Sequence, residues 1–265
     1  MASYNHDEFY RLAEYYDIAF DFRNVKKECD FIENIAQKLM KSLPKSFIEL
    51  GCGPSYHVLE FAKRKLFSLG LDISNEMVEY SNDKKENLSI NAEFICNDMI
   101  NFQIDHKIDV AAILMDSTSY LLDNSSFIKH LNCVADALNK NGIYILEMNH
   151  PRDVFNVGKS TGTDWKMTRD DKTVHTIWGS DSDKFDPITQ ITNTTVRLTV
   201  TEETKVIFEL EDKSKQRCFT ANEFKALVFA SGRFKIVDFF GSLDVDIPFD
   251  NSKKAWRMVP VLQKL

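Results

Sequence analysis

Hydrophobic positions along the chain change their spacing at about residue 150. Before it, from about residue 46, short runs that are almost entirely apolar alternate with segments whose apolar residues recur every three or four positions. Continuous apolar runs are typical of strands buried on both faces, and the wider spacing is typical of helices. Strands that alternate with helices predict a parallel sheet covered on both sides. We therefore expect a doubly wound, Rossmann-like α/β fold over this stretch.

The same pattern places the individual elements. Residues of about 7–42 are expected to be helical, because apolar residues recur at helical spacing until the chain approaches Pro44. Ser74 is suited to cap a later helix, and Ser125 or Ser126 another. Buried strands are expected in five segments: SFIEL, LFSLGLDI, AEFICND, DVAAILM and NGIYILEMN.

Helical spacing is lost between about 151 and 217. Thr/Val-rich or alternating segments there are separated by turn-like residues, which predicts an antiparallel β-rich insert. A helix with Thr220 and Glu223 as a capping box and Gly232 as its stop should follow, and then two strands. We expect a seven-stranded sheet with a final antiparallel strand pair, in one domain of residues 1–150 and 218–265 that the insert 151–217 interrupts.

Composition narrows the classes of function. The net charge is −7 with no Lys/Arg-dense stretch, which disfavours a nucleic-acid partner. No apolar run reaches 18 residues, so no membrane span is expected. The five cysteines are widely spaced and never form CxxC, which favours reduced thiols, a cytoplasmic location and no metal site.

A glycine pair marks the first candidate site. Gly51 and Gly53 follow the first strand and precede a helix, although the chain has only nine glycines. Such a pair lets backbone pass close to a ligand. Asp72 ends the second strand, where a carboxylate can accept both hydroxyls of a ribose. Together they predict a nucleoside-type ligand, although a tight turn and a strand-ending aspartate would look the same.

Two features distinguish between nucleoside ligands. A dinucleotide site usually has a third glycine where this chain has Tyr56. Glu49 precedes the turn, and its charge suits a cationic ligand and repels a pyrophosphate. S-adenosylmethionine, a cation without phosphate, fits better than a nicotinamide dinucleotide. An NAD(P)-dependent oxidoreductase stays open as an alternative.

Five segments in order resemble the motifs of class I S-adenosylmethionine-dependent methyltransferases: FIELGCGPS, LGLDIS, FICNDM, LMDSTSYLL and NKNGIYILEMN. The sequence departs from that family at Ser55, where a glycine is frequent. The N-terminal YYD followed by Arg23 is similar to the small-molecule N-methyltransferase branch, which includes glycine-type and deoxyaminosugar-type enzymes. The resemblance implies S-adenosylmethionine as cofactor and direct SN2 transfer of its methyl group to a small molecule. An amine is preferred over a hydroxyl, so a small-molecule O-methyltransferase is the alternative.

The resemblance also implies roles for single residues. The cofactor would be held by Tyr16, Arg23, Glu49, Gly51, Cys52, Gly53, Asp72, Ile73, Asn97, Asp98, Met99, Met115 and Asp116. Catalytic candidates are Tyr16, Tyr120 and His150. The insert would cap an acceptor pocket lined by Tyr120, His150, Trp165, His175 and Trp178.

Structural roles compete with several of these assignments. Tyr16 could serve only aromatic packing, Arg23 could be a surface charge, and the insert's aromatic residues could form its own core. Four histidines lack ligand spacing and are expected to be structural or at the surface: His6, His57, His106 and His130. A non-catalytic protein that binds S-adenosylmethionine and a homodimer also stay open.

Overall fold

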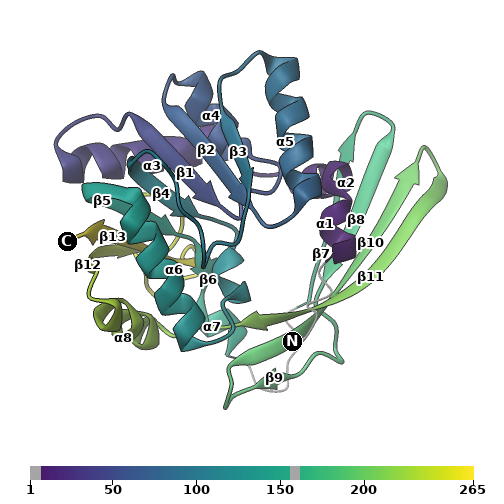
Figure 1. Ribbon diagram of the computed structural model, residues 1–265. Helices are drawn as coiled ribbons and strands as arrows, with labels where there is room; N and C mark the ends of the chain where they lie inside the picture. The colour runs from purple at the N-terminus through teal and green to yellow at the C-terminus, as the bar shows by residue number, and fades with distance from the viewer. Residues whose placement is uncertain (1–6, 156–161) are drawn as a thin grey trace.

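The computed structural model describes residues 7–155 and 162–265, and its largest element is a twisted sheet (Figure 1). Seven strands lie in the order β12-β13-β5-β4-β1-β2-β3, and the short β6 (Met148–Asn149) pairs with β13. Five neighbouring strands are parallel, and β13 runs antiparallel to both β5 and β12. The predicted α/β fold with a final antiparallel pair is confirmed. The strands are β1 (Ser46–Leu50), β2 (Phe67–Asp72), β3 (Glu93–Cys96), β4 (Ile108–Ile113), β5 (Leu138–Leu146), β12 (Phe234–Phe240) and β13 (Arg257–Lys264).

Helices cover both faces of this sheet. On one face α3 (Val25–Met40) and α4 (Tyr56–Lys63) bury apolar side chains against the strands. On the other face α6 (Asn124–Ala137) and α8 (Ala221–Ser231) form a second core with the same strands. This double cover explains why all five residues of β1 are buried and why its sequence reads as a continuous apolar run. Helix α5 (Asn75–Leu88) packs along β2 and β3.

The N-terminal region differs from the single helix predicted over 7–42. It forms α1 (Asp7–Arg11), α2 (Ala13–Ala19) and α3, with non-helical backbone at Leu12 and again between α2 and α3. The Asn24 side chain accepts a hydrogen bond from the Lys27 amide and so starts α3. Apolar spacing could not reveal these breaks, because all three helices bury one face.

Helix caps agree with the sequence in two cases and differ in one. Ser74 accepts from the Met77 amide and caps α5, and Thr220 with Glu223 forms the expected capping box of α8. The cap of α6 is Asp123, not Ser125 or Ser126, because its carboxylate accepts from the Ser126 amide at 2.8 Å. An aspartate is an equally good cap, and it lies at the start of the same polar run.

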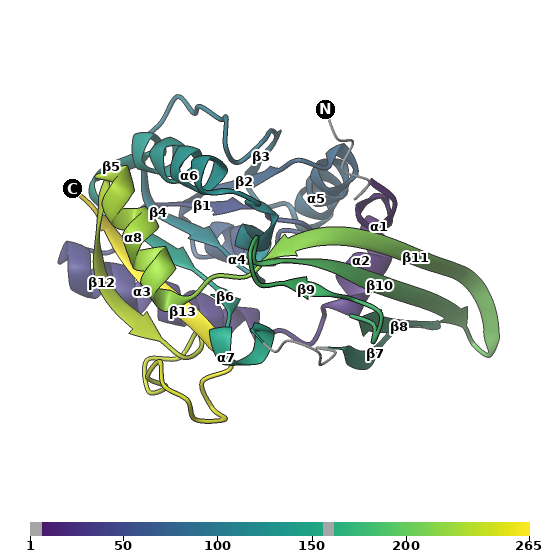
Figure 2. The same cartoon turned by 90° about the horizontal axis from the view of Figure 1, so that it is seen from below.

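The insert forms a separate antiparallel sheet in the order β11-β10-β8-β7, with β9 paired to β10 (Figures 1 and 2). Phe9, Ile18 and Phe20 of the N-terminal region pack against one of its faces and share a hydrophobic core with Val196 and Val200. The short α7 (Pro151–Val154) precedes it. Its strands are β7 (Thr163–Arg169), β8 (Lys172–Trp178), β9 (Phe185–Asp186), β10 (Ile191–Glu202) and β11 (Lys205–Arg217). The exact division into domain and insert stays a prediction.

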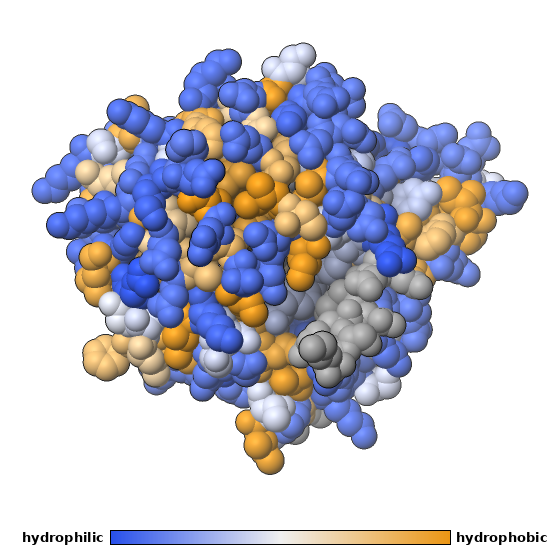
Figure 3. All heavy atoms as spheres, in the orientation of Figure 1, coloured by the Kyte–Doolittle hydropathy of each residue, from blue (hydrophilic) through white to orange (hydrophobic). Residues whose placement is uncertain are grey.

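Hydrophilic side chains cover most of the face of the molecule seen in Figure 3, and hydrophobic ones gather in smaller patches between them. Among the described helices, none has the length and apolar character needed to cross a membrane.

Candidate functional site

The turn after β1 has a backbone that few residues can adopt. Gly51 and Gly53 have φ of +63° and +49°, and Ser55 also lies in the left-handed region at +63°. A Cβ on Gly51 would lie 3.1 Å from the Ser117 hydroxyl oxygen. Both the dihedral angle and this close neighbour therefore favour glycine at the position. The Cys52 amide donates to the Leu71 carbonyl at 3.0 Å, which ties the turn to the end of β2.

Asp72 faces this turn from the end of β2. Its Oδ2 accepts from the Gly53 amide at 2.7 Å, and its Oδ1 accepts from the Ser74 amide at 2.9 Å. Burial raises the pKa of Asp72, against the pull of these backbone donors. Each carboxylate oxygen can accept a further hydrogen bond, so the side chain can hold the turn and still bind a pair of hydroxyls.

Glu49, in β1, is the acid that the sequence placed beside a cationic ligand. Its side chain is buried, and Oε1 lies 3.1 Å from Nδ1 of His57. The other oxygen, Oε2, is buried and has no hydrogen-bond partner among the residues that the structure describes. A buried carboxylate oxygen left without a donor is costly, and an ammonium group of a ligand would satisfy it.

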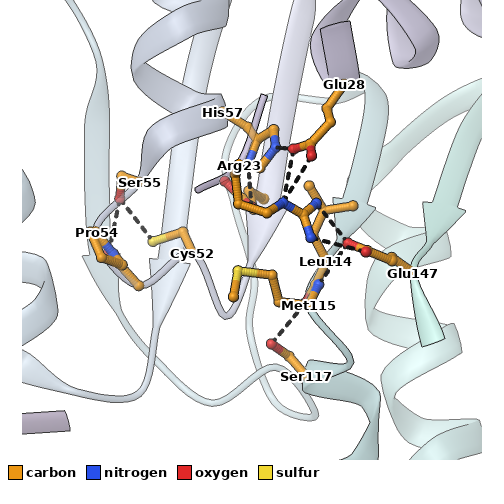
Figure 4. Close-up of polar contacts among 12 residues, drawn as sticks. Arg23, Glu28, Cys52, Pro54, Ser55, His57, Leu114, Met115, Ser117 and Glu147 are labelled. Atoms are coloured by element: carbon orange, nitrogen blue, oxygen red, sulfur yellow. Dashed lines mark hydrogen bonds and ion pairs between the residues drawn. The ribbon is translucent and has the colours of Figure 1, made fainter. Parts of the chain in front are cut away.

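Arg23 is not the surface charge that was one alternative, nor a free cation. Only 4% of its side chain is exposed; Nε donates to Glu28, and both terminal nitrogens donate to Glu147 at 3.0 and 2.9 Å (Figure 4). Three of its five N–H groups are therefore used within the protein. A carboxylate of the cofactor could reach only the two that remain, and the positive charge is already balanced.

Glu147, a partner of Arg23, also binds the segment at the exit of β4. Met115 and Asp116 both have positive φ, and the Met115 amide donates to Glu147 Oε2 at 3.0 Å. The Asp116 carboxylate accepts from the backbone and side-chain amides of Asn149, and burial raises its pKa to about 7. This strained segment leads directly into the short helix η1 (Ser117–Tyr120), which carries Tyr120.

The residues expected around an adenine lie together at the ends of β2 and β3. Ile73 is 71% exposed, and the Asn97 amide donates to the Asp72 carbonyl at 2.9 Å. Asp98 uses one oxygen to accept from the Ile100 amide, and Met99 packs partly against the core. An exposed apolar side chain beside half-buried polar groups suits the face and the edge of a purine ring.

A small pocket lies between α1, η1 and the insert sheet. Tyr10 and Tyr120 meet there with their hydroxyls 2.5 Å apart. Burial raises the pKa of Tyr120, so its phenol stays protonated at neutral pH. The lining is aromatic or apolar except for one carboxylate and a few hydroxyls: Phe9, Tyr10, Tyr120, Trp178, Val196, Asp212 and Ser214.

Tyr16 lies between this aromatic group and the glycine turn. Its ring packs on Phe9 and Phe20, and a Cβ on Gly53 would lie 3.8 Å from its Cε1. It thus contacts both the glycine turn and the aromatic residues that lead to the pocket. Packing and ligand contact are compatible roles for this residue.

Three residues expected in the acceptor pocket lie elsewhere. His150 is 3% exposed, with Nε2 bonded to the Asp250 carbonyl and Nδ1 accepting from the Arg152 amide, so it caps α7 and has no free nitrogen for catalysis. Trp165 donates to the Ala19 carbonyl and packs on α2. His175 pairs with Asp164 on the other face of the insert sheet from Trp178.

Sequence reasoning missed the polar part of the pocket. Asp212 and Ser214 lie on the face of β11 that also carries Phe208 and Leu210, which pack into the insert's core. Side chains alternate along a strand, so polar residues at positions that should be apolar were the available signal. Tyr10 was hidden in a helix that reads only as amphipathic.

Comparisons with known proteins agree with this geometry. Residues 47–142 match the family model described as a methyltransferase domain. A protein of Geobacillus sp. (strain WCH70) with a provisional methyltransferase name is 22% identical over 153 residues, which is 56% of this chain and 60% of that protein. The match thus spans less than two thirds of that relative's length.

Solved structures share the fold over nearly the whole chain. An S-adenosylmethionine-dependent methyltransferase from Clostridium acetobutylicum ATCC 824 has a TM-score of 0.78 and 18% identity, covering 96% of this chain and 98% of its own. The sugar N-methyltransferase KedS8 from Streptoalloteichus sp. ATCC 53650 has a TM-score of 0.73 and 15% identity, covering 94% and 92%. Residues 47–142 of this chain therefore match a methyltransferase domain, and the chain shares the fold of S-adenosylmethionine-dependent methyltransferases, in agreement with the resemblance seen in its sequence.

Proposed function

We propose that this protein transfers the methyl group of S-adenosylmethionine to the nitrogen of a small-molecule amine. The observation that carries the proposal is the buried, unpartnered Glu49 Oε2 beside a left-handed glycine turn, which fits the α-ammonium of a methionine moiety. The amine preference rests on the pocket on the far side of Tyr16.

The residues of the turn suit the parts of the cofactor in order. Glu49 would accept from the α-ammonium, Asp72 from the ribose hydroxyls, and Ile73 would cover the adenine. Asp98 and Asn97 are placed to bond its edge, and Met115 with Asp116 would wall the strand-four side. Of the guanidinium of Arg23, only the N–H groups not bound to Glu28 and Glu147 could meet the carboxylate.

The acceptor pocket favours a cation or an amine. Aromatic rings attract positively charged groups through their faces, and Asp212 adds the only carboxylate of the lining. The buried Ser214 hydroxyl has no hydrogen-bond partner in the described part of the chain, so a polar group of the acceptor could use it. One of the similar structures carries the name of a sugar N-methyltransferase, which is compatible with an acceptor that bears both an amine and hydroxyls.

When bound, S-adenosylmethionine would supply a methyl group activated by its sulfonium; transfer to a neutral amine would form an N–C bond, break the S–C bond and release S-adenosylhomocysteine. The protein's part is placement: rings of Tyr10, Tyr16 and Tyr120 exclude water and orient the acceptor. A protonated phenol such as that of Tyr120 can donate or accept a hydrogen bond but does not act as a base at neutral pH. The Asp212 carboxylate is placed to receive the proton that an ammonium must lose before it attacks.

Calorimetry and turnover together test the proposal. Purified protein should bind S-adenosylhomocysteine and gain no thermal stability from NADH. Turnover of S-adenosylmethionine with a panel of amines, aminosugars and phenols should give N-methylated products. Binding of NADH alone would overturn the cofactor assignment, and methylation of phenols with no reaction of amines would replace the acceptor by an oxygen nucleophile.

A further inference from the structure

His57, at the start of α4, lies between two carboxylates that approach it from different elements. Its Nδ1 is 3.1 Å from Oε1 of Glu49 in β1, and its Nε2 is 2.8 Å from Oε2 of Glu28 in α3. Only 3% of the histidine is exposed. Figure 4 shows the imidazole turned toward Glu28, with the Arg23 side chain below it and directed at the same carboxylate.

Hydrogen-bond chemistry fixes the charge of this ring. Ionised carboxylates only accept hydrogen bonds, so both ring nitrogens are satisfied only when both carry a proton. Burial lowers the pKa of His57, but Glu49 and Glu28 outweigh it and raise the pKa to about 9. The ring is therefore a buried imidazolium at neutral pH.

The imidazolium belongs to a row of alternating charges. Glu28 also binds Arg23, Arg23 binds Glu147, and Arg257 lies 3.2 Å from Glu147. With His57 protonated, this row of three acids and three bases is neutral. On α4 itself Glu60 pairs with Arg64, and on α3 burial keeps the pKa of Cys29 high, so its thiol adds no charge near the ring.

Within this row, Glu49 has one oxygen directed at His57 and one left over. Its Oε1 faces His57, and its Oε2 is the buried oxygen without a partner among the described residues. We propose that His57 is a positioning residue for the methionine part of the cofactor, holding Glu49 oriented so that Oε2 receives the α-ammonium. The inference rests on the proposed function and deepens it.

Removal of the imidazolium should therefore have a specific effect. Glutamine at position 57 can still form hydrogen bonds but carries no charge. In His57→Gln, Glu49 loses the positive charge that faces its Oε1. The carboxylate is then held less firmly, and Oε2 is a less well oriented acceptor for an ammonium.

Calorimetry with two ligands separates this role from a structural one. S-adenosylhomocysteine carries the α-ammonium, and 5′-methylthioadenosine lacks the whole amino-acid part. His57→Gln should weaken binding of S-adenosylhomocysteine at least tenfold at pH 7. Binding of 5′-methylthioadenosine should change less than twofold. His175→Gln, which removes a histidine paired with the exposed Asp164, should leave both affinities unchanged.

The outcomes are distinct. Equal losses for the two ligands would reduce His57 to a structural residue. If the wild type binds neither ligand, the proposed function itself fails. NMR titration of the wild-type imidazole needs no variant: a His57 ring that is neutral at pH 7 would overturn the proposal even if His57→Gln does not fold.

Discussion

At the scale of single residues, the site depends on backbone angles that a side chain disfavours. Gly51 and Gly232 have nearly the same φ, +63° and +62°, but different surroundings. A Cβ on Gly51 would meet the Ser117 side chain at 3.1–3.2 Å, whereas one on Gly232, at the end of α8, would meet nothing within 4 Å. A comparison of alanine substitutions at these two glycines therefore separates the effect of backbone strain from the effect of crowding in the site.

Gly51→Ala should lower both stability and affinity for S-adenosylhomocysteine. The left-handed angle alone costs about 1 kcal/mol for alanine, and the contact with Ser117 adds to it by shifting the turn. We expect a tenfold or greater rise in the Kd, measured by calorimetry, and a lower urea midpoint. Gly232→Ala should show the loss of stability without any change in Kd. Equal affinities for the two variants would mean that the turn does not contact the ligand.

The contribution of Glu147 to stability depends on pH in a direction that follows from its lowered pKa. Glu147 is 1% exposed; burial raises its pKa, but Arg23 and Arg257 outweigh this and lower it to about 2. A depressed carboxylate contributes stability above its unfolded pKa of about 4.5 and loses that contribution as pH falls toward 2. The stabilising effect of Glu147 is therefore complete at neutral pH.

Glu147→Gln should destabilise the protein by about 3–5 kcal/mol at pH 7, because it leaves Arg23 buried with only Glu28 as partner. Urea denaturation measures this, and the difference from wild type should shrink as pH falls below 4.5. Glu211→Gln, which breaks the exposed pair with Arg197, should cost about 1 kcal/mol or less. Similar costs for the two variants would contradict a strongly coupled buried pair.

The sequence was most informative for residues whose place in the fold follows from their position next to a strand or a turn. The glycine turn, Asp72 and Glu49 could be placed because strand, turn and acid follow in a fixed order along the chain. Arg23 and His57 could not be understood this way, since their partners Glu147 and Glu28 come from other elements. Spacing along a sequence does not show which charges a fold brings together.

At the scale of elements, Asp17 of the YYD segment joins α2 to three other elements. Its carboxylate is 1% exposed and binds Lys84 and Tyr80 of α5 and Arg169 of β7. Its carbonyl accepts from Tyr56 at the start of α4. The N-terminal helices, the insert and the cofactor-side helices thus meet at one buried charge.

Asp17→Asn should loosen the contact between α2 and the insert. It leaves two cations near a neutral group, and a buried pair that loses one partner costs about 3–5 kcal/mol. Hydrogen exchange should rise in α2 and β7 while α6 stays protected. Asp21→Asn removes a half-exposed partner of the same Arg169 and serves as the control. If protection were lost uniformly across the chain, Asp17 would stabilise the whole fold and not this contact in particular.

Elements themselves were predicted better than their ends. The alternation of strands and helices and the capping box of α8 follow from local patterns, and both are present. The breaks at Leu12 and before Asn24 were missed, because each of these helices buries an apolar face, α1 and α2 against the insert sheet and α3 against the main sheet. Tertiary packing, more than propensity, decides where these helices end.

At the scale of the whole molecule, the proposed acceptor pocket is formed by segments that are distant in the sequence. Tyr10 comes from α1, Tyr120 from the exit of β4, and Asp212 from the insert. Of the residues expected to line an acceptor pocket, Tyr120 and Trp178 line this one. His175 lies on the opposite face of the insert sheet, and Trp165 lies on the same face as Trp178 but packs on α2.

A substitution of Asp212 should distinguish binding of the acceptor from binding of the cofactor. Asp212→Asn keeps the shape of the side chain and removes its charge. With an amine acceptor found in the panel, we expect KM to rise about tenfold or more, which corresponds to about 1.4 kcal/mol. The Kd of S-adenosylhomocysteine should change less than twofold, because Asp212 lines the acceptor pocket and not the glycine turn. Glu209→Gln alters an exposed acid on the opposite face of the same strand and should change neither value. An unchanged KM in Asp212→Asn would mean that the acceptor's nitrogen lies elsewhere, and the case for a cationic acceptor would then lose its main support.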